Sequence, residues 1–332
     1  MDRMNPLLQI NENLSVSTPK LSYHDGVVLA EWRKAALRKL NELLGMDSFL
    51  ETDLNLRIEH EKERNDHKEI KFVITTEKYF DMPCYLLLPN EIENPPLMVC
   101  LQGHSSGVHI SLGKPKFDGD EAIIDSGSDF GIQSVKQGFA ALCIEMRYFG
   151  ERKEHPDEKG PECWIPSMSE IMMGRTAIGG RVWDIMKALD ALEQSFSDTV
   201  DMTKVAILGH SGGGTASLYA AALEPRIQAV ISSCALCSFS KSISVIKHCV
   251  CNHIPGILNW FEMGDLAGLI APKPLVAVAG IKDEIFPIEG IKEAYATVEK
   301  WYKLSGAPDA CRLVVGDGGH RFFPEQAWGA FL

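Results

Sequence analysis

Apolar and polar positions follow two different periods along the chain. Before residue 90, apolar residues alternate with polar ones at 54–58, 70–74 and 82–88, which predicts half-buried strands. From residue 97 onward, short runs become almost continuously apolar, as expected for strands that are buried on both faces of a sheet. These runs are 97–101, 140–144, 205–208, 229–232, 275–279 and 313–315.

Segments with helical spacing separate these runs. Residues 182–192 and 291–301 each gather their apolar side chains on one face of a helix. An earlier helix is predicted over 27–44, with Gly45 as its C-cap. Alternating strands and helices predict an α/β fold, with a mostly parallel central sheet covered by helices on both faces and antiparallel N-terminal strands at its edge.

The pattern predicts one main domain. We expect residues 1–50 to form a leader and a helix that packs on the core, and residues 51–332 to form a single domain without internal repeats. Three long excursions leave the sheet near 105–131, 151–173 and 236–269. They follow strands at the carboxyl edge, where open α/β sheets bind ligands, so we expect them to form the pocket walls.

One apolar run leads directly into a Gly-rich turn. Residues 205–214 read V-A-I-L-G-H-S-G-G-G and continue into a helical stretch. A strand, a tight turn and a helix with Ser211 at the apex make the G-x-S-x-G pattern of a nucleophile elbow. Side chains at Gly209 or Gly213 would collide with the neighbouring strand or helix. A Gly-rich turn that contains a serine by chance is the alternative, and the flanking strand and helix favour the elbow.

A nucleophilic serine needs a general base that is itself oriented by a carboxylate. After an elbow, the acid and then the histidine follow later strands in chain order. Asp283 follows the run 275–279 and is the predicted acid, with the adjacent Glu284 as the alternative. His320 follows the run 313–315 and is the predicted base. Each residue alone would be an ordinary turn residue, but three in this order at strand ends point to a catalytic triad.

The predicted chemistry also requires donors for an oxyanion, each contributing roughly 3–4 kcal/mol. One is expected to be the amide of Gly212, directly after the nucleophile. The other is expected to be the amide of His104 in the loop after 97–101, where Gly103 allows close backbone approach. The His104 ring is then a wall of the site, and the His210 ring packs in the elbow.

Several segments together resemble the α/β-hydrolase superfamily, and more narrowly its acetyl xylan esterase and dienelactone hydrolase-like branch. They are the elbow, the Asp283 and His320 segments, and the runs 102–104, 145–152, 174–184 and 269–275. The resemblance implies a serine-dependent hydrolase of carboxylic esters that works through an acyl-enzyme without a metal or cofactor. The expected substrate is a small soluble molecule, a short-chain or acetyl ester of a small or sugar-like compound.

Two departures from the family pattern narrow this expectation. Dienelactone hydrolases use cysteine where this chain has Ser211, which favours ordinary ester hydrolysis. Secreted xylan-degrading members carry a signal peptide, and residues 1–10 have no such apolar run, which argues against polymeric xylan. Two alternatives stay open: a serine peptidase of the prolyl-oligopeptidase type, and a non-catalytic binding protein on the same fold.

Composition excludes several classes of partner. The 332 residues carry a formal net charge of −12, so a nucleic-acid partner is not expected. No run approaches the roughly 18 apolar residues of a membrane span, so no membrane association is expected. Nine scattered cysteines predict reduced thiols and a cytoplasmic location. The sequence leaves homo-oligomerisation open.

Other polar and aromatic residues have both a substrate-binding and a structural interpretation. Arg147 is a candidate for binding a substrate carboxylate, with pairing to Asp184 or Glu145 as the alternative. Trp164 and Trp260 lie in the excursions and are candidates for stacking on a sugar or aryl group, with loop packing as the alternative. The same two interpretations apply, more weakly, to Arg175 and Arg181.

Cysteine and histidine also cluster in the third excursion, at 248–253, and Cys234-x-x-Cys237 lies shortly before it. Such clusters suggest zinc. The paired C-x-x-C motifs of a structural zinc site are missing, however, and the cluster at Cys249–His253 is expected to line the pocket. No metal is therefore predicted.

Overall fold

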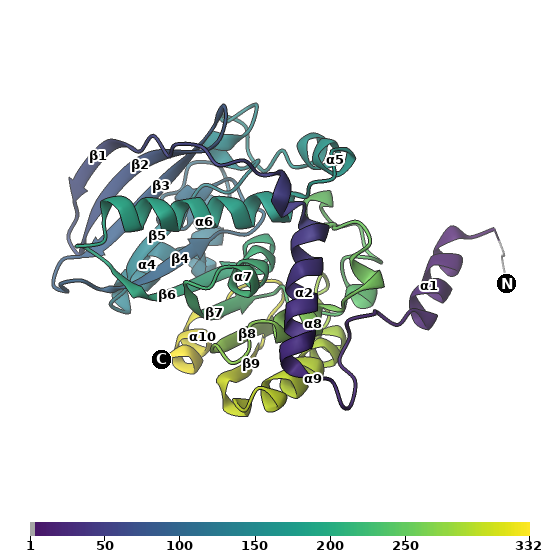
Figure 1. The fold of residues 1–332 in the computed structure, drawn as a ribbon. Coiled ribbons are helices and arrows are strands. Elements are labelled where there is room, and N and C mark those ends of the chain that lie inside the picture. The colour runs from purple at the N-terminus through teal and green to yellow at the C-terminus, as the bar shows by residue number, and fades with distance from the viewer. Residues whose placement is uncertain (1–3) are drawn as a thin grey trace.

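A computed structural model describes residues 4–332. A nine-stranded sheet with the order β1-β2-β3-β5-β4-β6-β7-β8-β9 runs through the molecule (Figure 1). The strands are β1 (Arg57–Glu63), β2 (His67–Glu77), β3 (Phe80–Pro89), β4 (Pro96–Leu101), β5 (Ala140–Ile144), β6 (Asp201–His210), β7 (Ile227–Ser233), β8 (Leu275–Gly280) and β9 (Cys311–Gly316).

The sheet is mixed, with its two strand directions segregated as predicted. β1, β2, β3 and β5 pair in antiparallel fashion. From β5 through β4, β6, β7 and β8 to β9, every neighbouring pair is parallel. This arrangement confirms the predicted fold class, and it brings the carboxyl ends of β4, β6, β8 and β9 to one edge of the sheet.

The first strand begins later than the alternation at 54–58 predicts. Leu54 and Leu56 pack partly against the core but precede β1, and β1 itself is almost wholly exposed. β1 lies at the sheet edge and pairs only with β2, and its residues are mostly charged. Charged residues on an edge strand protect it from pairing with other chains, and such a strand has no buried face to produce an apolar pattern.

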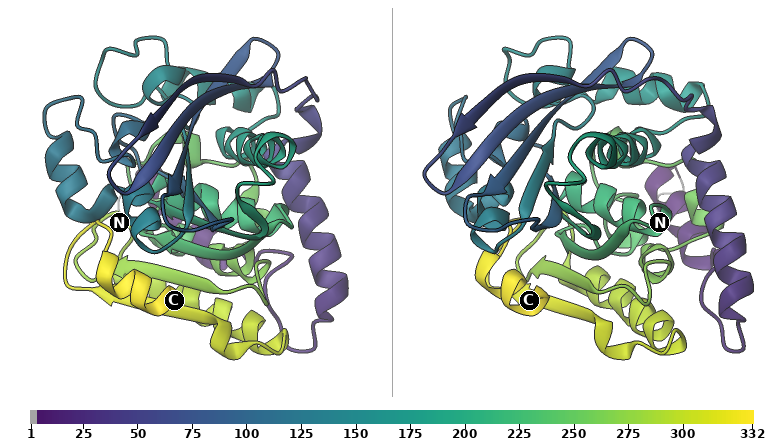
Figure 2. Two further views of the ribbon diagram at one scale, coloured as in Figure 1. Left: turned by 90° about the vertical axis from the view of Figure 1, so that its left-hand side faces the viewer. Right: turned by 60° about the vertical axis from the view of Figure 1, so that its left-hand side comes forward.

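Helices cover both faces of the sheet (Figures 1 and 2). They are α1 (Pro6–Val16), α2 (Leu29–Leu44), α3 (Asp120–Ile123), α4 (Phe130–Lys136), α5 (Trp164–Met172), α6 (Ala177–Ser195), α7 (Gly212–Leu223), α8 (Met263–Gly268), α9 (Ile288–Leu304) and α10 (Pro324–Phe331). α2, α6, α7, α8 and α9 contribute to one apolar core, and α4 and α10 to the other.

Side chains of the central strands divide between these two cores. Along β4, Leu97 and Val99 enter the larger core, whereas Met98 and Cys100 enter the smaller one. Side chains of a strand alternate between the two faces of a sheet, so a strand buried on both sides must be apolar at every position. This is the physical reason for the continuous apolar runs in the sequence.

The N-terminal segment contains a helix that the sequence analysis did not predict. α1 follows Asn5, whose side chain accepts a hydrogen bond from the Leu7 amide, and it buries none of its residues. It lies apart from the sheet (Figure 1). α2 agrees with the predicted helix, and Gly45 ends it in the left-handed conformation at φ 72°. Within residues 4–332, the helices are too short or too polar to cross a membrane.

Candidate active site

The turn between β6 and α7 has the geometry of a nucleophile elbow. Ser211 stands between strand and helix with φ 54° and ψ −121°, a conformation that costs energy for a residue with a Cβ atom. Its amide donates to the Ser233 carbonyl of β7 at 2.8 Å, and its own carbonyl accepts from the Thr215 amide at 2.9 Å. The neighbouring strand and the first turn of α7 therefore hold Ser211 in this strained position.

The glycines around Ser211 are required by space. A Cβ atom on Gly209 would overlap the Gly213 carbonyl, and a Cβ atom on Gly213 would overlap the Leu101 carbonyl of β4. The fold therefore confirms that side chains at these two positions would collide with their neighbours. Any larger residue at either position would push the helix away from the sheet.

Asp283 and His320 meet beside the elbow. Asp283 follows β8, His320 follows β9, and His320 Nδ1 lies 2.8 Å from Asp283 Oδ2. A carboxylate only accepts hydrogen bonds, so Nδ1 carries the proton and Nε2 is left with a free lone pair. His320 and Ser211 line the same cavity.

The surroundings of Asp283 keep its carboxyl group ionised. Burial alone would raise its pKa, but the hydrogen bond and charge of His320 outweigh burial and lower the pKa. The amides of Ile285 and Phe286 also donate to Asp283 Oδ1, at 2.8 and 3.0 Å. The adjacent Glu284, the alternative acid, is exposed and has no such position. Asp283 is the carboxylate that the fold directs toward His320.

His210, the residue before Ser211, is held in its neutral form. Burial and then the charge of His320 lower its pKa to about 3. Its Nδ1 lies 3.0 Å from Ser233 Oγ, and its ring lies 4.9 Å from the His320 ring. A neutral ring at this position packs against His320 without competing for a proton.

The loop after β4 approaches the elbow closely. A Cβ atom on Gly103 would lie 3.2 Å from Ser211 Cβ, and one on Gly212 would lie 2.7 Å from His104 Cε1. The His104 ring thus covers Gly212, and the backbones that carry the two candidate oxyanion donors lie side by side. His104 also lines the cavity, as expected for a wall of the site.

The buried carboxyl group of Glu145 holds the loop after β4 through hydrogen bonds. Glu145 accepts hydrogen bonds from Gln102 Nε2 and from the Val108 amide, both at 3.0 Å. Burial raises the pKa of Glu145 to about 7, although the amides of Glu151 and Val108 oppose the shift. Glu145 therefore fixes the start of the first excursion directly beside Gly103 and His104.

The cavity at Ser211 has a volume of about 460 Å³. The first and third excursions contribute to its walls, as the sequence predicts, whereas the second excursion, 151–173, lines a different cavity. The lining is mixed. The apolar part is formed by Ile110, Ile123, Ile246 and Ile285. Around it lie Ser126, Ser128, Lys247, His248 and Arg321. Lys247 and Arg321 are exposed and form no ion pair with a carboxylate among residues 4–332, so the entrance carries positive charge. The sequence analysis missed both cations, although Arg321 directly follows His320 and Lys247 directly precedes the cluster at 248–253.

The structure places Arg147 outside the cavity, and its assignment as a substrate contact is wrong. The guanidinium is 1% exposed and lies 2.8 Å from Asp184 and 2.6 Å from Glu77. Arg152 binds the same Asp184 carboxylate at 2.6 Å. A buried charge requires buried partners, and these carboxylates supply them. Arg147 is therefore part of an internal ion-pair network, the structural alternative that the sequence left open.

The two tryptophans do not line the Ser211 cavity, so the structure does not bring them to the predicted site. Trp164 begins α5 with 67% exposure and lines a different cavity of about 890 Å³, together with Tyr148 and Arg152. Trp260 packs beneath the ammonium groups of Lys20 and Lys39, at 4.7 and 4.2 Å from its ring centre.

The cysteines and histidines of the third excursion contribute to two places in the structure, the Ser211 cavity and a separate side-chain cluster. His248 and Cys249 line the cavity, as expected. Cys249 and Cys251 also gather with His104 and with Cys163, from the start of α5. Cys163 was not recognised in the sequence because it lies about 90 residues away from Cys251 along the chain.

Comparisons with known proteins agree with this description. Residues 108–236 match a family model described as glucuronyl esterase, fungi. YtaP of Bacillus subtilis (strain 168), which is named only as a candidate hydrolase, is 27% identical over 88% of this chain and 93% of its own length.

Solved structures with the same fold include a candidate acetyl xylan esterase from Bacteroides fragilis NCTC 9343. It has a TM-score of 0.76 and 16% identity, and the match covers 94% of this chain and 82% of that chain. A glucuronoyl esterase from Solibacter usitatus has a TM-score of 0.66 and 15% identity, with 95% of both chains covered.

The sheet order, the elbow and the similar solved structures together show that the protein has the α/β-hydrolase fold. Within that class it is similar to carbohydrate esterases, both acetyl xylan and glucuronoyl esterases, which confirms the resemblance that the sequence motifs indicated.

Proposed function

We propose that this protein is a serine-dependent hydrolase of carboxylic esters, and that its substrate is a small sugar-like molecule with a short acyl group such as acetyl. The observation that carries the proposal is the convergence of Ser211, His320 and the buried Asp283 at one cavity. The similarity to carbohydrate esterases supports the substrate class.

In the proposed mechanism, Ser211 Oγ attacks the ester carbonyl while His320 Nε2 takes the hydroxyl proton. Asp283 orients His320 through Nδ1 and stabilises the imidazolium that forms. The carbonyl oxygen becomes an oxyanion, which the amides of Gly212 and His104 stabilise. The C–O bond to the leaving alcohol then breaks, and His320 returns the proton to that oxygen.

The second half of the reaction repeats these steps with water. His320 takes a proton from water, and the hydroxide oxygen bonds to the acyl carbon. Collapse of this second intermediate breaks the bond to Ser211, which regains its proton from His320. The products are the free acid and the enzyme in its starting state.

The cavity supports a small substrate of mixed polarity. A volume of about 460 Å³ lies within the range of pockets that bury small organic ligands. Its isoleucine side chains suit a short acyl group, while serine, histidine and lysine side chains offer partners for hydroxyl groups. Positive charge from Lys247 and Arg321 favours substrates that carry an anionic group beside the ester.

A second candidate is hydrolysis of an ester formed by the carboxyl group of a uronic acid. The glucuronyl esterase family model over residues 108–236 favours it, because that stretch includes the elbow and much of the pocket wall. Both candidates use the same triad, and they differ in which side of the ester bond carries the sugar.

A substrate panel tests the proposal. Acetylated monosaccharides, a uronic acid methyl ester, nitrophenyl acetate and a dipeptide nitroanilide would be assayed with the wild type and with Ser211→Ala. We expect hydrolysis of at least one sugar ester by the wild type alone. Preference for the uronic ester would select the second candidate, and cleavage of the anilide without any ester would establish the peptidase alternative.

A further inference from the structure

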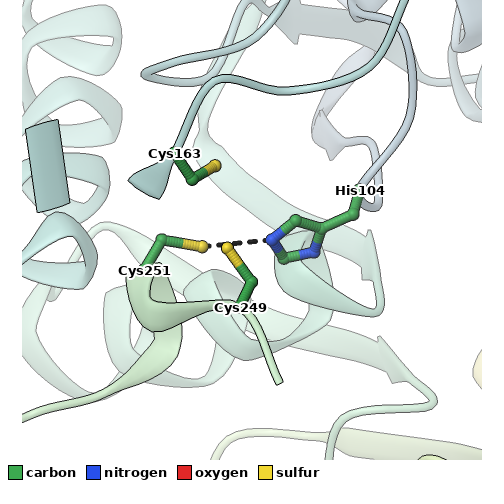
Figure 3. A group of neighbouring side chains, drawn as sticks. All are labelled: His104, Cys163, Cys249 and Cys251. Atoms are coloured by element: carbon green, nitrogen blue, oxygen red, sulfur yellow. Dashed lines mark hydrogen bonds between the residues drawn. The ribbon is translucent and has the colours of Figure 1, made fainter. Parts of the chain in front are cut away.

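Four potential metal ligands, His104 and three cysteines, converge on one point (Figure 3). One ligand atom from each of His104, Cys163, Cys249 and Cys251 lies within 4.8 Å of the other three. His104 Nε2 and Cys251 Sγ are 3.1 Å apart. Cys163 and Cys251 are buried, and the other two are partly buried. The cluster therefore encloses one small volume that is lined by one nitrogen and three sulfur atoms.

The dimensions of this cluster fit a tetrahedral zinc ion. Zn–S bonds of ~2.3 Å and Zn–N bonds of ~2.0 Å place two sulfur ligands ~3.8 Å apart, and sulfur and nitrogen ligands ~3.5 Å apart. Small side-chain shifts reach these values from the present positions. Three cysteines and one histidine also make a complete ligand set for a structural zinc site, which leaves no position open for water.

A buried arginine supplies independent evidence for negative charge in the cluster. Arg181 is 1% exposed, and its Nη2 lies 3.8 Å from Cys163 Sγ. Its Nε and Nη1 atoms have no hydrogen-bond partner, and no carboxylate among residues 4–332 pairs with it. Arg147, by contrast, has carboxylate partners within 2.6 and 2.8 Å. An uncompensated buried cation is strongly destabilising, so Arg181 requires an anionic neighbour.

Zinc coordination provides that neighbour. Three thiolates, one neutral imidazole and one Zn²⁺ ion have a net charge of −1, which the guanidinium of Arg181 neutralises. With all three sulfur atoms protonated, Arg181 would have no counter-charge. The position of Arg181 is thus explained by the metal-bound form of the cluster.

We propose that His104, Cys163, Cys249 and Cys251 bind a single zinc ion in a closed structural site. The ion would tie together three segments that are distant in sequence: the loop after β4, the start of α5, and the third excursion. If the His104 amide donates to the oxyanion, which rests on the proposed function, the zinc ion also holds that donor in place through the His104 ring. Metal content itself does not depend on catalysis.

Metal analysis of the full-length protein tests the site. The protein would be purified with reductant, without chelator and with its affinity tag removed, and its zinc measured by plasma mass spectrometry. We expect about one zinc ion per chain in the wild type. Cys251→Ser and Cys163→Ser should each hold at least about tenfold less zinc after dialysis against a chelator. Cys311→Ser, which changes a buried cysteine outside the cluster, should retain it.

Two further measurements keep the test decisive if a cysteine variant fails to fold. Cobalt exchanged into the wild type should give the intense visible absorption of a tetrahedral cobalt–thiolate site. Arg181→Gln keeps all four ligands and should weaken zinc affinity by about 10–100-fold. Ser211→Ala should keep its zinc while losing hydrolysis, which separates this proposal from the proposed function.

The proposal would be overturned by wild-type protein that holds no zinc and takes none up with reductant present. It would also be overturned by a disulfide that joins two of the three cysteines in the reduced preparation. Undiminished zinc in Cys251→Ser and Cys163→Ser, with an unchanged cobalt spectrum, would place the metal elsewhere and reject this site.

Discussion

His320 Nδ1 lies 2.8 Å from Asp283 Oδ2, while the neighbouring Glu284 points into solvent. This pair fixes the imidazole ring so that Nε2 is available to take a proton in the cavity. Two adjacent carboxylates thus have different environments. Only Asp283 is buried and receives two backbone amides, and only Asp283 can orient the base.

Asp283→Asn is therefore predicted to lower kcat by about 10⁴-fold with little change in KM, because the amide favours the wrong histidine tautomer. Glu284→Gln is the matched control and should retain nearly full activity. Steady-state kinetics with one ester measure both. Comparable activity in both variants would contradict the assignment of the acid.

Removing the Arg147 guanidinium should destabilise the fold rather than weaken substrate binding. Arg147→Ala leaves Asp184 and Glu77 with fewer partners inside the protein and is expected to cost about 3–5 kcal/mol in unfolding free energy. Lys204→Ala removes an exposed cation paired with Asp201 and should change stability little. Urea unfolding measures both. A large rise in KM for Arg147→Ala at unchanged stability would restore the substrate-binding interpretation.

The raised pKa of Glu145 predicts a pH-dependent contribution to stability. Its pKa is about 7 in the folded protein against 4.5 as the ordinary value, so the folded state binds more protons between these values. The resulting stabilisation is complete below pH 4.5 and is lost as pH rises through about 7, a change of about 3 kcal/mol.

The side chain introduced by Glu145→Gln cannot ionise, so this variant should not lose that stabilisation as pH rises. The unfolding free energy of the wild type, measured relative to the variant, should therefore fall as pH rises from 4.5 to 8. Parallel stability curves for the two proteins would show that Glu145 does not titrate in this range.

Positive charge at the cavity entrance should act on anionic substrates. Lys247→Ala and Arg321→Ala are each expected to raise KM for an ester with a nearby carboxylate by about fivefold, equivalent to about 1 kcal/mol. A neutral ester of the same size should be unaffected, and added salt should reduce the difference. Lys204→Ala, distant from the cavity, is the control variant. Equal effects on both esters would remove charge as a basis of selectivity.

The sequence predicted those features that depend on local pattern or chain order. Continuous apolar runs revealed the parallel strands because both faces of the sheet are covered. Ser211, Asp283 and His320 could be identified because the fold places each directly after a strand, in a constant order.

Features that depend on partners distant in the chain could not be predicted. His104 and Cys251 meet although 147 residues separate them, and the sequence shows neither this contact nor the third segment that carries Cys163. The residues adjacent to Arg147 in the sequence do not indicate whether its side chain faces a substrate or Asp184. α1 left no apolar pattern because it buries nothing.

Covalent labelling of Ser211 tests the central claim most directly. A fluorophosphonate reacts with an activated serine and leaves a stable phosphonyl group on its Oγ. Intact mass and peptide mapping of the wild type should show one adduct, located on Ser211. Ser211→Ala should show none, and Asp283→Asn should react far more slowly. A wild-type protein that stays unlabelled, or that carries its adduct on another residue, would contradict the assignment of Ser211 as the nucleophile.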